Sequence, residues 1–334
     1  MIDTGKPRNV GHPFPDVTSK VLRRTQPFEG RPHPSAHRFS RRPVFPPNLM
    51  KVARPLLFAA LLASSSASFS LMAQSPAPAL PAQLGSKVFV WDDLKVVPTA
   101  TGLRRDVVDR PTATFEKFES HVTTLNPGKS SHPPHKHARE EFIIVKEGTL
   151  EVHINGRVQR AGPGSVLFYA SNDLHSVTNA GPTPATYLVF NYETVATRTA
   201  PAEGAAAANL PGKLPSTVFD WEKLPVKTTR TGDRREVMNS PTVTCANLEC
   251  HITTLSPGEV PHAAHRHPDE EIVIVKEGVM AVTINGVTNR GGPGSIFFFG
   301  SNDEHGMRNV GGTTATYHVV RIVTAATPKA ATKS

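Results

Sequence analysis

The chain of 334 residues contains one segment of 109 residues twice, and this duplication limits its fold more than any other feature. Residues 86–194 align with 216–324 at a constant offset of 130 without a gap, and 54 of the 109 positions are identical. A repeat of this length is too long for a solenoid unit and matches one small domain per copy. We therefore predict two tandem domains, over 86–194 and 216–324, joined by a linker over 195–215 that is rich in alanine, proline and glycine. Trp91 and Trp221 occupy equivalent places, and we expect them to pack in the core or between the domains.

The residues before the first copy have a different composition. Residues 1–49 contain nine prolines and nine lysines or arginines against three acids, which is typical of a segment that buries too little apolar surface to fold. Residues 50–73 begin with a basic cluster, continue with the apolar run Leu56–Ala63 and end in small residues, as secretory signal peptides do. We predict a disordered extension over 1–49, a signal peptide over 50–73 and export of the remainder to the periplasm or the cell exterior. Met50 is then the expected start, and residues 1–49 need not be translated; the alternative is a disordered basic tail with a buried apolar helix.

The net charge of +9 does not indicate a nucleic-acid partner. Residues 1–49 contribute +6 and residues 50–73 contribute +2, which leaves +1 for the rest of the chain. A basic surface of the kind that binds nucleic acid is therefore not expected on the repeats. The run Leu56–Ala63 is also too short to span a bilayer as a stable helix, so we expect no stable membrane anchor.

Both copies have the pattern of β-strands. The apolar runs are short and rich in β-branched and aromatic residues; in the first copy they include Phe142–Val145, Val152–Ile154, Val166–Tyr169 and Tyr187–Phe190. Asn155-Gly156 and Asn285-Gly286 predict tight hairpins, because Asn and Gly tolerate the positive φ angles of a type I′ turn. No amphipathic helix pattern is present, so we predict an all-β fold made of sandwiches or barrels.

Each copy also carries three histidines and a glutamate at the same relative positions. The sets are His135, His137, Glu141 and His175 in the first copy, and His265, His267, Glu271 and His305 in the second. Three imidazoles and one carboxylate are sufficient ligands for a divalent transition metal, and they suit manganese, iron, nickel, zinc or copper. We therefore predict one metal site per copy.

The spacing of these residues predicts how they reach the metal. Residues two or four apart on one strand share a face, so we expect His135, His137 and Glu141 to point inward from one strand. Glu140, and Glu270 in the second copy, should then point the other way. The last histidine of each set should come from a later strand.

These motifs resemble those of the cupin superfamily. The first motif of that family, a glycine, His-x-His, a glutamate and a glycine, is matched by Gly128–Gly148 and Gly258–Gly278, and the second by 162–179 and 292–309. The first motif has one residue more than the basic pattern before its first histidine, and the second motif is longer before its histidine. Both differences leave the ligands in place. The resemblance covers about two thirds of the chain and implies a bicupin, two jelly-roll β-barrels with a metal inside each.

Two further groups of polar residues are candidates for a functional role. His132 and His262 lie three residues before the first ligand and are the candidate catalytic residues, as gates or as proton shuttles near neutral pH. The alternative is a solvated loop histidine. The pairs Arg104-Arg105 and Arg234-Arg235 could bind an anionic substrate, face solvent or bridge the barrels.

Two kinds of function remain open at this point. The first is an exported metalloenzyme that acts on a small carboxylated or oxygenated molecule, for which the resemblance allows a decarboxylase, a dioxygenase or a hydrolase. The second is a non-catalytic protein whose metal stabilises the barrel or binds a small ligand or sugar without turnover. A small molecule is the expected partner in both cases. A homodimer is a possible assembly, because exposed apolar strand faces of jelly rolls often pair.

Overall fold

The computed structural model describes residues 82–329, and these residues form an all-β structure, as predicted. They contain twenty strands and three short 3-10 helices. The predicted extension over 1–49 and the predicted signal peptide over 50–73 lie outside the described residues. Within the described part of the chain, no helix has the length and hydropathy needed to cross a membrane.

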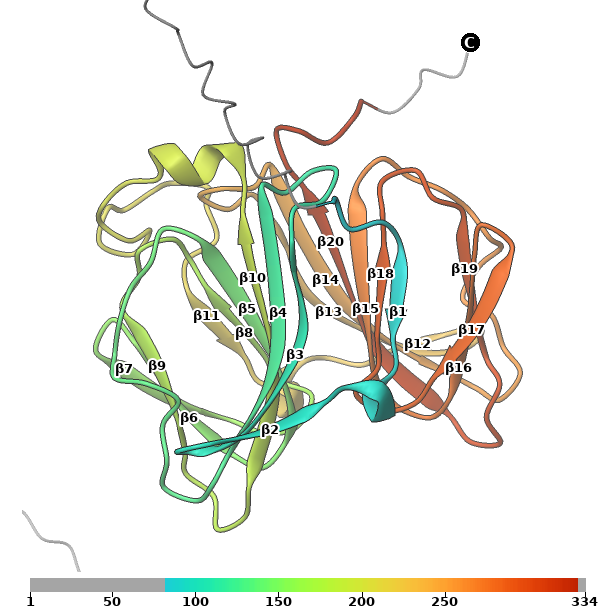
Figure 1. The fold of residues 1–334 in the computed structure, drawn as a ribbon, viewed down its shortest axis with the longest axis horizontal. Helices are drawn as coiled ribbons and strands as arrows, with labels where there is room; N and C mark the ends of the chain where they lie inside the picture. The colour runs from blue at the N-terminus through green and yellow to red at the C-terminus, as the bar shows by residue number, and fades with distance from the viewer. Residues whose placement is uncertain (1–81, 330–334) are drawn as a thin grey trace, which may run out of the picture. The chain divides into compact units, whose positions relative to one another are not determined.

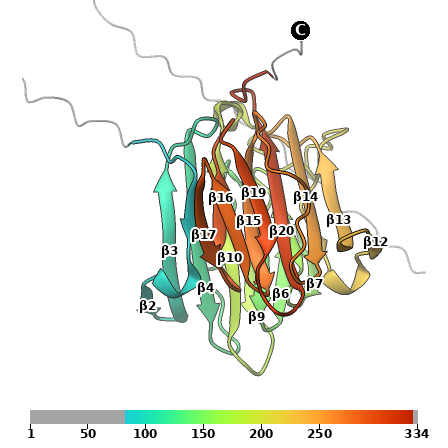
Figure 2. The same ribbon diagram turned by 90° about the vertical axis from the view of Figure 1, so that its right-hand side faces the viewer.

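Most strands of each repeat form one barrel, which consists of a seven-stranded sheet facing a three-stranded sheet (Figure 1). In barrel 1 the strands are β2 (Val96–Thr99), β3 (Gly102–Arg110), β4 (Lys117–Leu125), β5 (Glu140–Glu147), β6 (Leu150–Ile154), β7 (Arg157–Ala161), β8 (Val166–Tyr169), β9 (His175–Asn179) and β10 (Ala185–Glu193). In barrel 2 they are β12 (Lys227–Thr229), β13 (Gly232–Ser240), β14 (Asn247–Leu255), β15 (Glu270–Glu277), β16 (Met280–Ile284), β17 (Val287–Gly291), β18 (Ile296–Phe299), β19 (His305–Asn309) and β20 (Ala315–Val323). The small sheets have the orders β7-β6-β9 and β17-β16-β19, and the second is turned toward the viewer in Figure 2.

The barrels exchange their edge strands. The large sheets have the orders β11-β8-β5-β10-β4-β3-β2 and β1-β18-β15-β20-β14-β13-β12. Strand β1 (Lys87–Phe89) precedes barrel 1 in the sequence but pairs antiparallel with β18 of barrel 2, and β11 (Thr217–Phe219) pairs with β8 of barrel 1. The sequence repeats and the sheets therefore do not coincide, and each sheet is completed by a strand from the other repeat.

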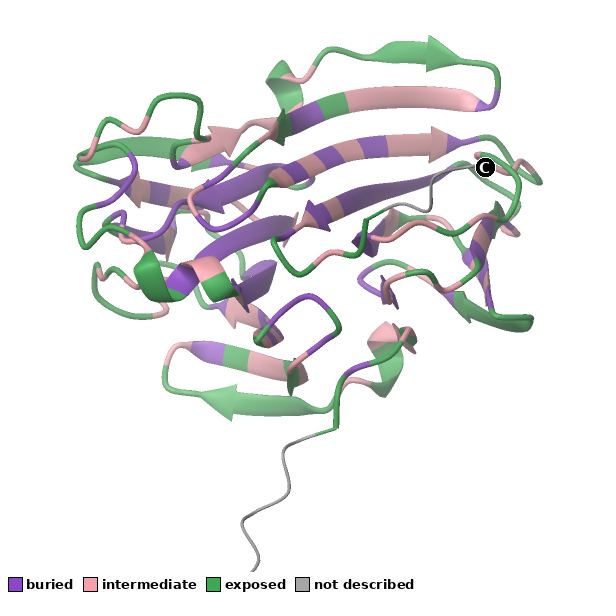
Figure 3. Ribbon diagram, turned by 90° about the horizontal axis from the view of Figure 1, so that it is seen from above, coloured by how far each residue is buried: buried purple, intermediate pink, exposed green. Residues whose placement is uncertain are grey.

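The central strands of the large sheets are buried on both faces. Along β5, Ile143 and Val145 point into barrel 1 toward the small sheet, whereas Phe142 and Ile144 point toward the other barrel. The inter-barrel layer is aromatic at its centre, where the rings of Phe118 and Phe298 stack with centroids 5.5 Å apart. Figure 3 shows the buried residues concentrated on these central strands. Burial of both faces explains why β5, β8 and β10 are continuous apolar runs and not alternating ones.

The two predicted hairpins are confirmed. Asn155 and Gly156 have φ angles of 47° and 79°, and Asn285 and Gly286 have φ angles of 47° and 84°. These positive angles let β6 turn into β7, and β16 into β17, without splaying the strands.

The tryptophans pack between the barrels, as expected. Trp91 begins the 3-10 helix η1 (Trp91–Asp93) and lies against Gly294 of barrel 2. Arg105 and Lys146 lie over the same ring, 4.4 Å and 4.7 Å from its centroid. Trp221, which begins η3 (Trp221–Lys223), repeats this arrangement against Gly164 of barrel 1. The indole rings thus hold the exchanged strands in place through apolar and cation–π contacts.

Two buried carboxylates join the barrels as well. Glu140 is fully buried and accepts hydrogen bonds from the hydroxyls of Thr242 and Thr244, at 2.6 Å and 2.7 Å, and from the backbone N–H of Val243 at 2.9 Å. Glu270 accepts the equivalent bonds from the loop around Thr112 and Thr114 of barrel 1. The prediction that Glu140 and Glu270 point away from the barrel interior is confirmed.

The segment between the repeats is partly packed against barrel 1. It begins with the 3-10 helix η2 (Val195–Thr199), and Ala205 is 5% exposed. Gly204 lies against the Asp173 carboxylate so closely that a Cβ atom there would have no room.

Candidate metal centre

The four predicted ligands of barrel 1 come together from a loop and two strands. His135 and His137 lie in the loop before β5, Glu141 is the second residue of β5, and His175 begins β9. The expectation that the first three share one strand is wrong, because the pairing of β5 with its neighbours starts only at Glu140. The loop is held instead by reciprocal backbone hydrogen bonds between His135 and His175, at 3.1 Å and 2.9 Å.

The side chains converge in both barrels. The ring-nitrogen ligand atoms of His135, His137 and His175 all lie within 4.8 Å of one another, and so do those of the second triad, His265, His267 and His305. The glutamate stands beside its triad: Glu141 Oε2 is 3.5 Å from His137 Nε2, and Glu271 Oε2 is 3.2 Å from His267 Nε2.

Hydrogen bonds fix which nitrogen of several histidines faces the centre. Nδ1 of His137 donates to the carbonyl of Arg139 at 2.8 Å, and Nδ1 of His175 donates to the carbonyl of Asp173 at 2.8 Å. Their Nε2 atoms are buried without a hydrogen-bond partner among the described residues, and so is Nε2 of His305. A ligand histidine with its far N–H bonded to a carbonyl presents a free Nε2 lone pair, so these orphaned atoms fit a metal ion.

Aromatic rings support the last histidine of each set. The ring of Tyr169 stacks on His175 with centroids 4.2 Å apart, and Phe299 stacks on His305 at the same distance. The preceding β8 and β18 strands therefore fix the imidazole planes before any metal binds.

The protonation states also suit metal binding. Burial lowers the pKa of His175 to about 4 and, together with the nearby histidines, the pKa of His265 to about 4. Burial alone would raise the pKa of Glu141, but the nearby His137 ring and the charge of the neighbouring histidines hold it below its ordinary value. Neutral imidazoles and an ionised carboxylate are the forms that bind a transition metal.

His267 differs from its partner in barrel 1. Burial opposes its charge, but hydrogen bonds with Asp269 and Glu271 raise its pKa to about 9. Asp269 Oδ1 lies 3.4 Å from His267 Nδ1, and the equivalent residue of barrel 1 is Arg139. Metal binding in barrel 2 therefore displaces a proton from His267.

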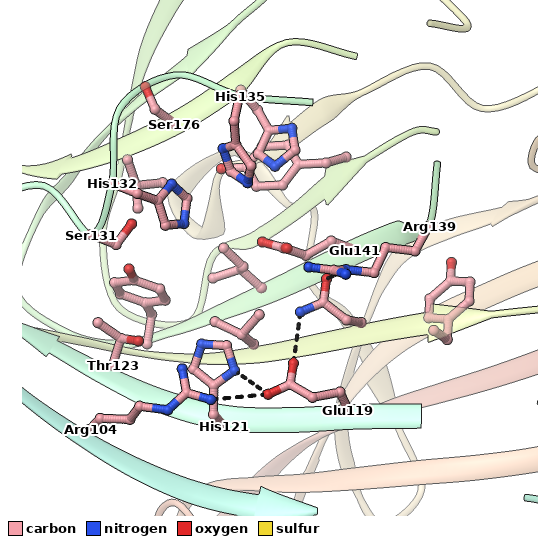
Figure 4. A pocket seen from close by; sticks show the side chains of 18 of the residues that line it. Arg104, Glu119, His121, Thr123, Ser131, His132, His135, Arg139, Glu141 and Ser176 are labelled. Carbon is pink, nitrogen blue, oxygen red and sulfur yellow. Dashed lines mark hydrogen bonds and ion pairs between the residues drawn. The ribbon is translucent and has the colours of Figure 1, made fainter. Parts of the chain in front are cut away.

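His135, Glu141 and His175 line one wall of a cavity of about 410 Å³ in barrel 1 (Figure 4). His132 reaches this cavity, and its ring contacts that of His135 edge-on with centroids 4.0 Å apart. His262 contacts His265 in the same way at 4.4 Å. The candidate catalytic histidines thus stand beside the ligands, although the residues themselves are exposed.

A second polar cluster forms the floor of this cavity and was missed at the level of sequence. Glu119 Oε1 lies 2.7 Å from His121 Nδ1 and accepts a hydrogen bond from Arg104 at 3.2 Å, and its other oxygen accepts one from Asn191 at 2.9 Å (Figure 4). Barrel 2 repeats the dyad, with Glu249 Oε1 2.6 Å from His251 Nδ1. The signal was present in both copies as Glu-x-His, two residues on one face of β4 and β14.

The paired arginines divide their roles. Arg104 and Arg234 line the cavities, whereas Arg105 and Arg235 lie over the indole rings of Trp91 and Trp221. One member of each pair therefore forms ion pairs at the cavity, Arg104 with Glu119 and Arg234 with Glu249, and the other joins the barrels.

Comparisons with known proteins agree with this architecture. A family model described as a cupin domain matches residues 121–191 and again residues 251–321. No curated protein matches the sequence significantly.

Several solved structures have a similar fold. Oxalate decarboxylase from Lactobacillus farciminis, in a formate complex, is 16% identical with a TM-score of 0.53, over 73% of this chain and 88% of that one. A mutant of Bacillus subtilis oxalate decarboxylase is 15% identical with a TM-score of 0.53, over 75% of this chain and 80% of that one. Protein Ylba from E. coli is 14% identical with a TM-score of 0.55, over 74% of this chain and 94% of that one. At identities this low the comparison establishes the fold alone, and the reaction has to be inferred from the residues of the site.

Proposed function

Because the chain is a bicupin, a member of the cupin family with two cupin domains, we propose that it is a metal-dependent enzyme acting on a small carboxylated or oxygenated molecule. One observation carries this proposal: buried imidazole nitrogens without partners converge beside a carboxylate at the wall of a cavity large enough for a small organic molecule. A purely structural metal site has no need of an adjoining cavity lined with polar groups.

The residues that would hold the ion are His135, His137, Glu141 and His175 in barrel 1, and His265, His267, Glu271 and His305 in barrel 2. A divalent ion bound there, with manganese, iron, nickel, zinc and copper all suited to these ligands, supplies Lewis-acid polarisation of a substrate oxygen and a template for binding.

The remaining polar groups suit proton transfer. Nδ1 of His121 lies against the Glu119 carboxylate, so the carboxylate orients the ring. This dyad lies on the floor of the cavity that the metal ligands border, which suits a general base for a bound substrate. His132, beside His135, is suited to pass protons between the cavity and solvent.

Activity assays distinguish decarboxylase, dioxygenase and hydrolase chemistry. The likeness to two oxalate decarboxylases supports small carboxylic acids as the first substrates to test. Oxygen uptake and carbon dioxide release over a panel of small acids and phenolics separate the three reactions.

Metal content tests the proposal directly. We expect about two equivalents of metal in the purified full chain, and a loss of both metal and turnover when His137→Ala and His267→Ala are combined. His153→Ala is the matched control, because that histidine lies on the partly exposed strand β6, away from the triad. Metal content unchanged in the double variant would remove the proposal, and ligand-induced melting shifts without turnover would favour a non-catalytic binding protein.

We also propose export to the periplasm or cell exterior, on the composition of residues 50–73. The intact mass of the protein from its native host tests this, since cleavage after Ala73 leaves a chain that begins at Gln74. A homodimer is supported by exposed apolar side chains on and beside edge strand β2, where Val96 is 43% and Val97 41% exposed. Sedimentation equilibrium measures that assembly.

A further inference from the structure

The two cavities have the same ligands and the same Glu–His dyad but differ in where they place one arginine. Arg139, in the loop before β5, corresponds to Asp269 in the second repeat. Asn191, on β10, corresponds to Arg321 on β20. The arginine has therefore moved from the loop in barrel 1 to the strand in barrel 2, and a carboxylate has taken its place in the loop.

In barrel 2 the arginine is neutralised by the protein itself. Nε of Arg321 donates to Asp269 Oδ2 at 2.8 Å, and a terminal nitrogen donates to Oδ1 at 3.0 Å. Glu271 Oε2 lies 4.0 Å from the same guanidinium. A bidentate pair of this kind occupies the N–H edge of the guanidinium that would otherwise bind a ligand carboxylate.

In barrel 1 the arginine of the loop, Arg139, has a neutral partner. Nε of Arg139 donates to Asn191 Oδ1 at 3.2 Å. Within residues 82–329, no carboxylate forms an ion pair with Arg139, while Asn191 turns its amide N–H toward Glu119. Arg139 lines the cavity, and Figure 4 shows its side chain alongside Glu141, next to the metal ligands.

From this contrast we infer that Arg139 binds a small carboxylate anion in the barrel 1 cavity, and that barrel 2 has no such subsite. An arginine without an acidic partner offers parallel N–H donors that match the two oxygens of a carboxylate. The inference deepens the proposed function and rests on it for the neighbouring metal, since it assigns acidic substrates to barrel 1. Asn191 is a positioning residue, because it holds Arg139 without neutralising it.

Fluorine NMR of trifluoroacetate, added to the zinc-loaded full chain, measures this binding without turnover. We expect Arg139→Gln to weaken trifluoroacetate binding about tenfold or more, as the loss of a charge-assisted hydrogen-bond pair predicts. Arg321→Gln should leave the affinity unchanged. The exchange variant Asp269→Arg/Arg321→Asn rebuilds the barrel 1 arrangement in barrel 2 and should add a second binding site.

Zinc content of the same samples separates the two proposals. Two equivalents of zinc with trifluoroacetate binding that Arg139→Gln does not weaken, or that Arg321→Gln weakens equally, would overturn the Arg139 subsite alone. Absence of zinc from the folded wild-type chain would instead overturn the proposed metal-dependent function. Arg139→Lys should restore only part of the affinity, because lysine keeps the charge but not the paired donors; full restoration would refute the bidentate geometry.

Discussion

His318 should make the contact between the barrels sensitive to acid. This residue on β20 is fully buried, and its Nε2 donates a hydrogen bond to the carbonyl of Gly164 in barrel 1 at 2.9 Å. Its Nδ1 has no hydrogen-bond partner in the described part of the chain. Burial, with the nearby charge of Lys276, lowers the pKa of His318 to about 4. The first repeat has Leu188 at this position, so leucine is compatible with the packing.

The size and sign of the effect follow from this pKa. An unfolded histidine has a pKa of about 6.5, so the folded protein disfavours the charged ring. Above about pH 6.5 the ring is neutral in both the folded and the unfolded chain, and the folded protein keeps its full stability. The free energy of unfolding decreases as the pH falls toward 4, because the unfolded chain then binds the proton that the folded chain disfavours. Linkage gives a loss from this group, relative to pH 7, of about 1 kcal/mol at pH 5.5 and about 2.5 kcal/mol at pH 4.5.

Urea unfolding of the wild type and of His318→Leu, both with a metal chelator, measures the difference. We expect the free energies of unfolding to agree within about 1 kcal/mol at pH 7.5. At pH 4.5 the variant should be the more stable by about 2.5 kcal/mol, since all other titrating groups are common to both proteins. His153→Thr, which introduces the residue of the second repeat at a partly exposed position of β6, should show no such divergence. Parallel curves for wild type and His318→Leu from pH 7.5 to 4.5 would refute the reasoning.

Three further predictions concern other contacts. Glu140→Ala should lower the free energy of unfolding by about 3 kcal/mol, because buried donors of the opposite barrel lose their acceptor. The control Glu147→Ala, at an exposed position, should change it by less than about 0.5 kcal/mol. Equal effects of the two variants in urea unfolding would contradict this prediction. Asp269→Asn should weaken metal binding in barrel 2 about tenfold in a competition titration with a chelator. The carboxylate, 3.4 Å from His267 Nδ1, adds to the hydrogen bond that this nitrogen donates to the Asp269 carbonyl at 2.9 Å and so helps to orient the ring; unchanged affinity would argue against that role. Gly164→Ala should lower the free energy of unfolding by about 2 kcal/mol or more, since φ is +89° and the new Cβ would lie 2.5 Å from the Trp221 ring. The control Gly162→Ala has open space for its Cβ, and its melting temperature should lie near that of the wild type.

The sequence determined the features that depend on local pattern and on internal repetition. The offset of 130 residues predicted two equivalent barrels, and short β-branched runs predicted their strands. Asn-Gly pairs predicted the hairpins because the positive φ angles of the turn depend on the two turn residues and not on distant contacts. The eight candidate metal ligands were visible because the same residue types recur at the same positions in both copies.

Strand continuity around the ligands was harder to predict. His135 and His137 are polar residues at even spacing, which a strand and a loop both allow. The structure places them in a loop held to β9 by backbone hydrogen bonds between His135 and His175. The second copy has the same loop with Ala263 and Ala264 in place of the two prolines, so the loop depends on this tertiary contact and not on proline.

Tertiary structure alone decided which strands pair and which charges meet. The segments before Trp91 and Trp221 form β1 and β11, and each of them pairs with a strand of the opposite barrel. The Glu–His dyads share cavities with the metal ligands because β4 and β14 lie in the same sheets as β5 and β15, with β10 and β20 between them. Arg139 and Arg321 are equally charged in the sequence, and only the fold determines that Asp269 neutralises one of them. Pairing partners and the neutralisation of a charge depend on distances through space, which a local pattern of residues does not encode.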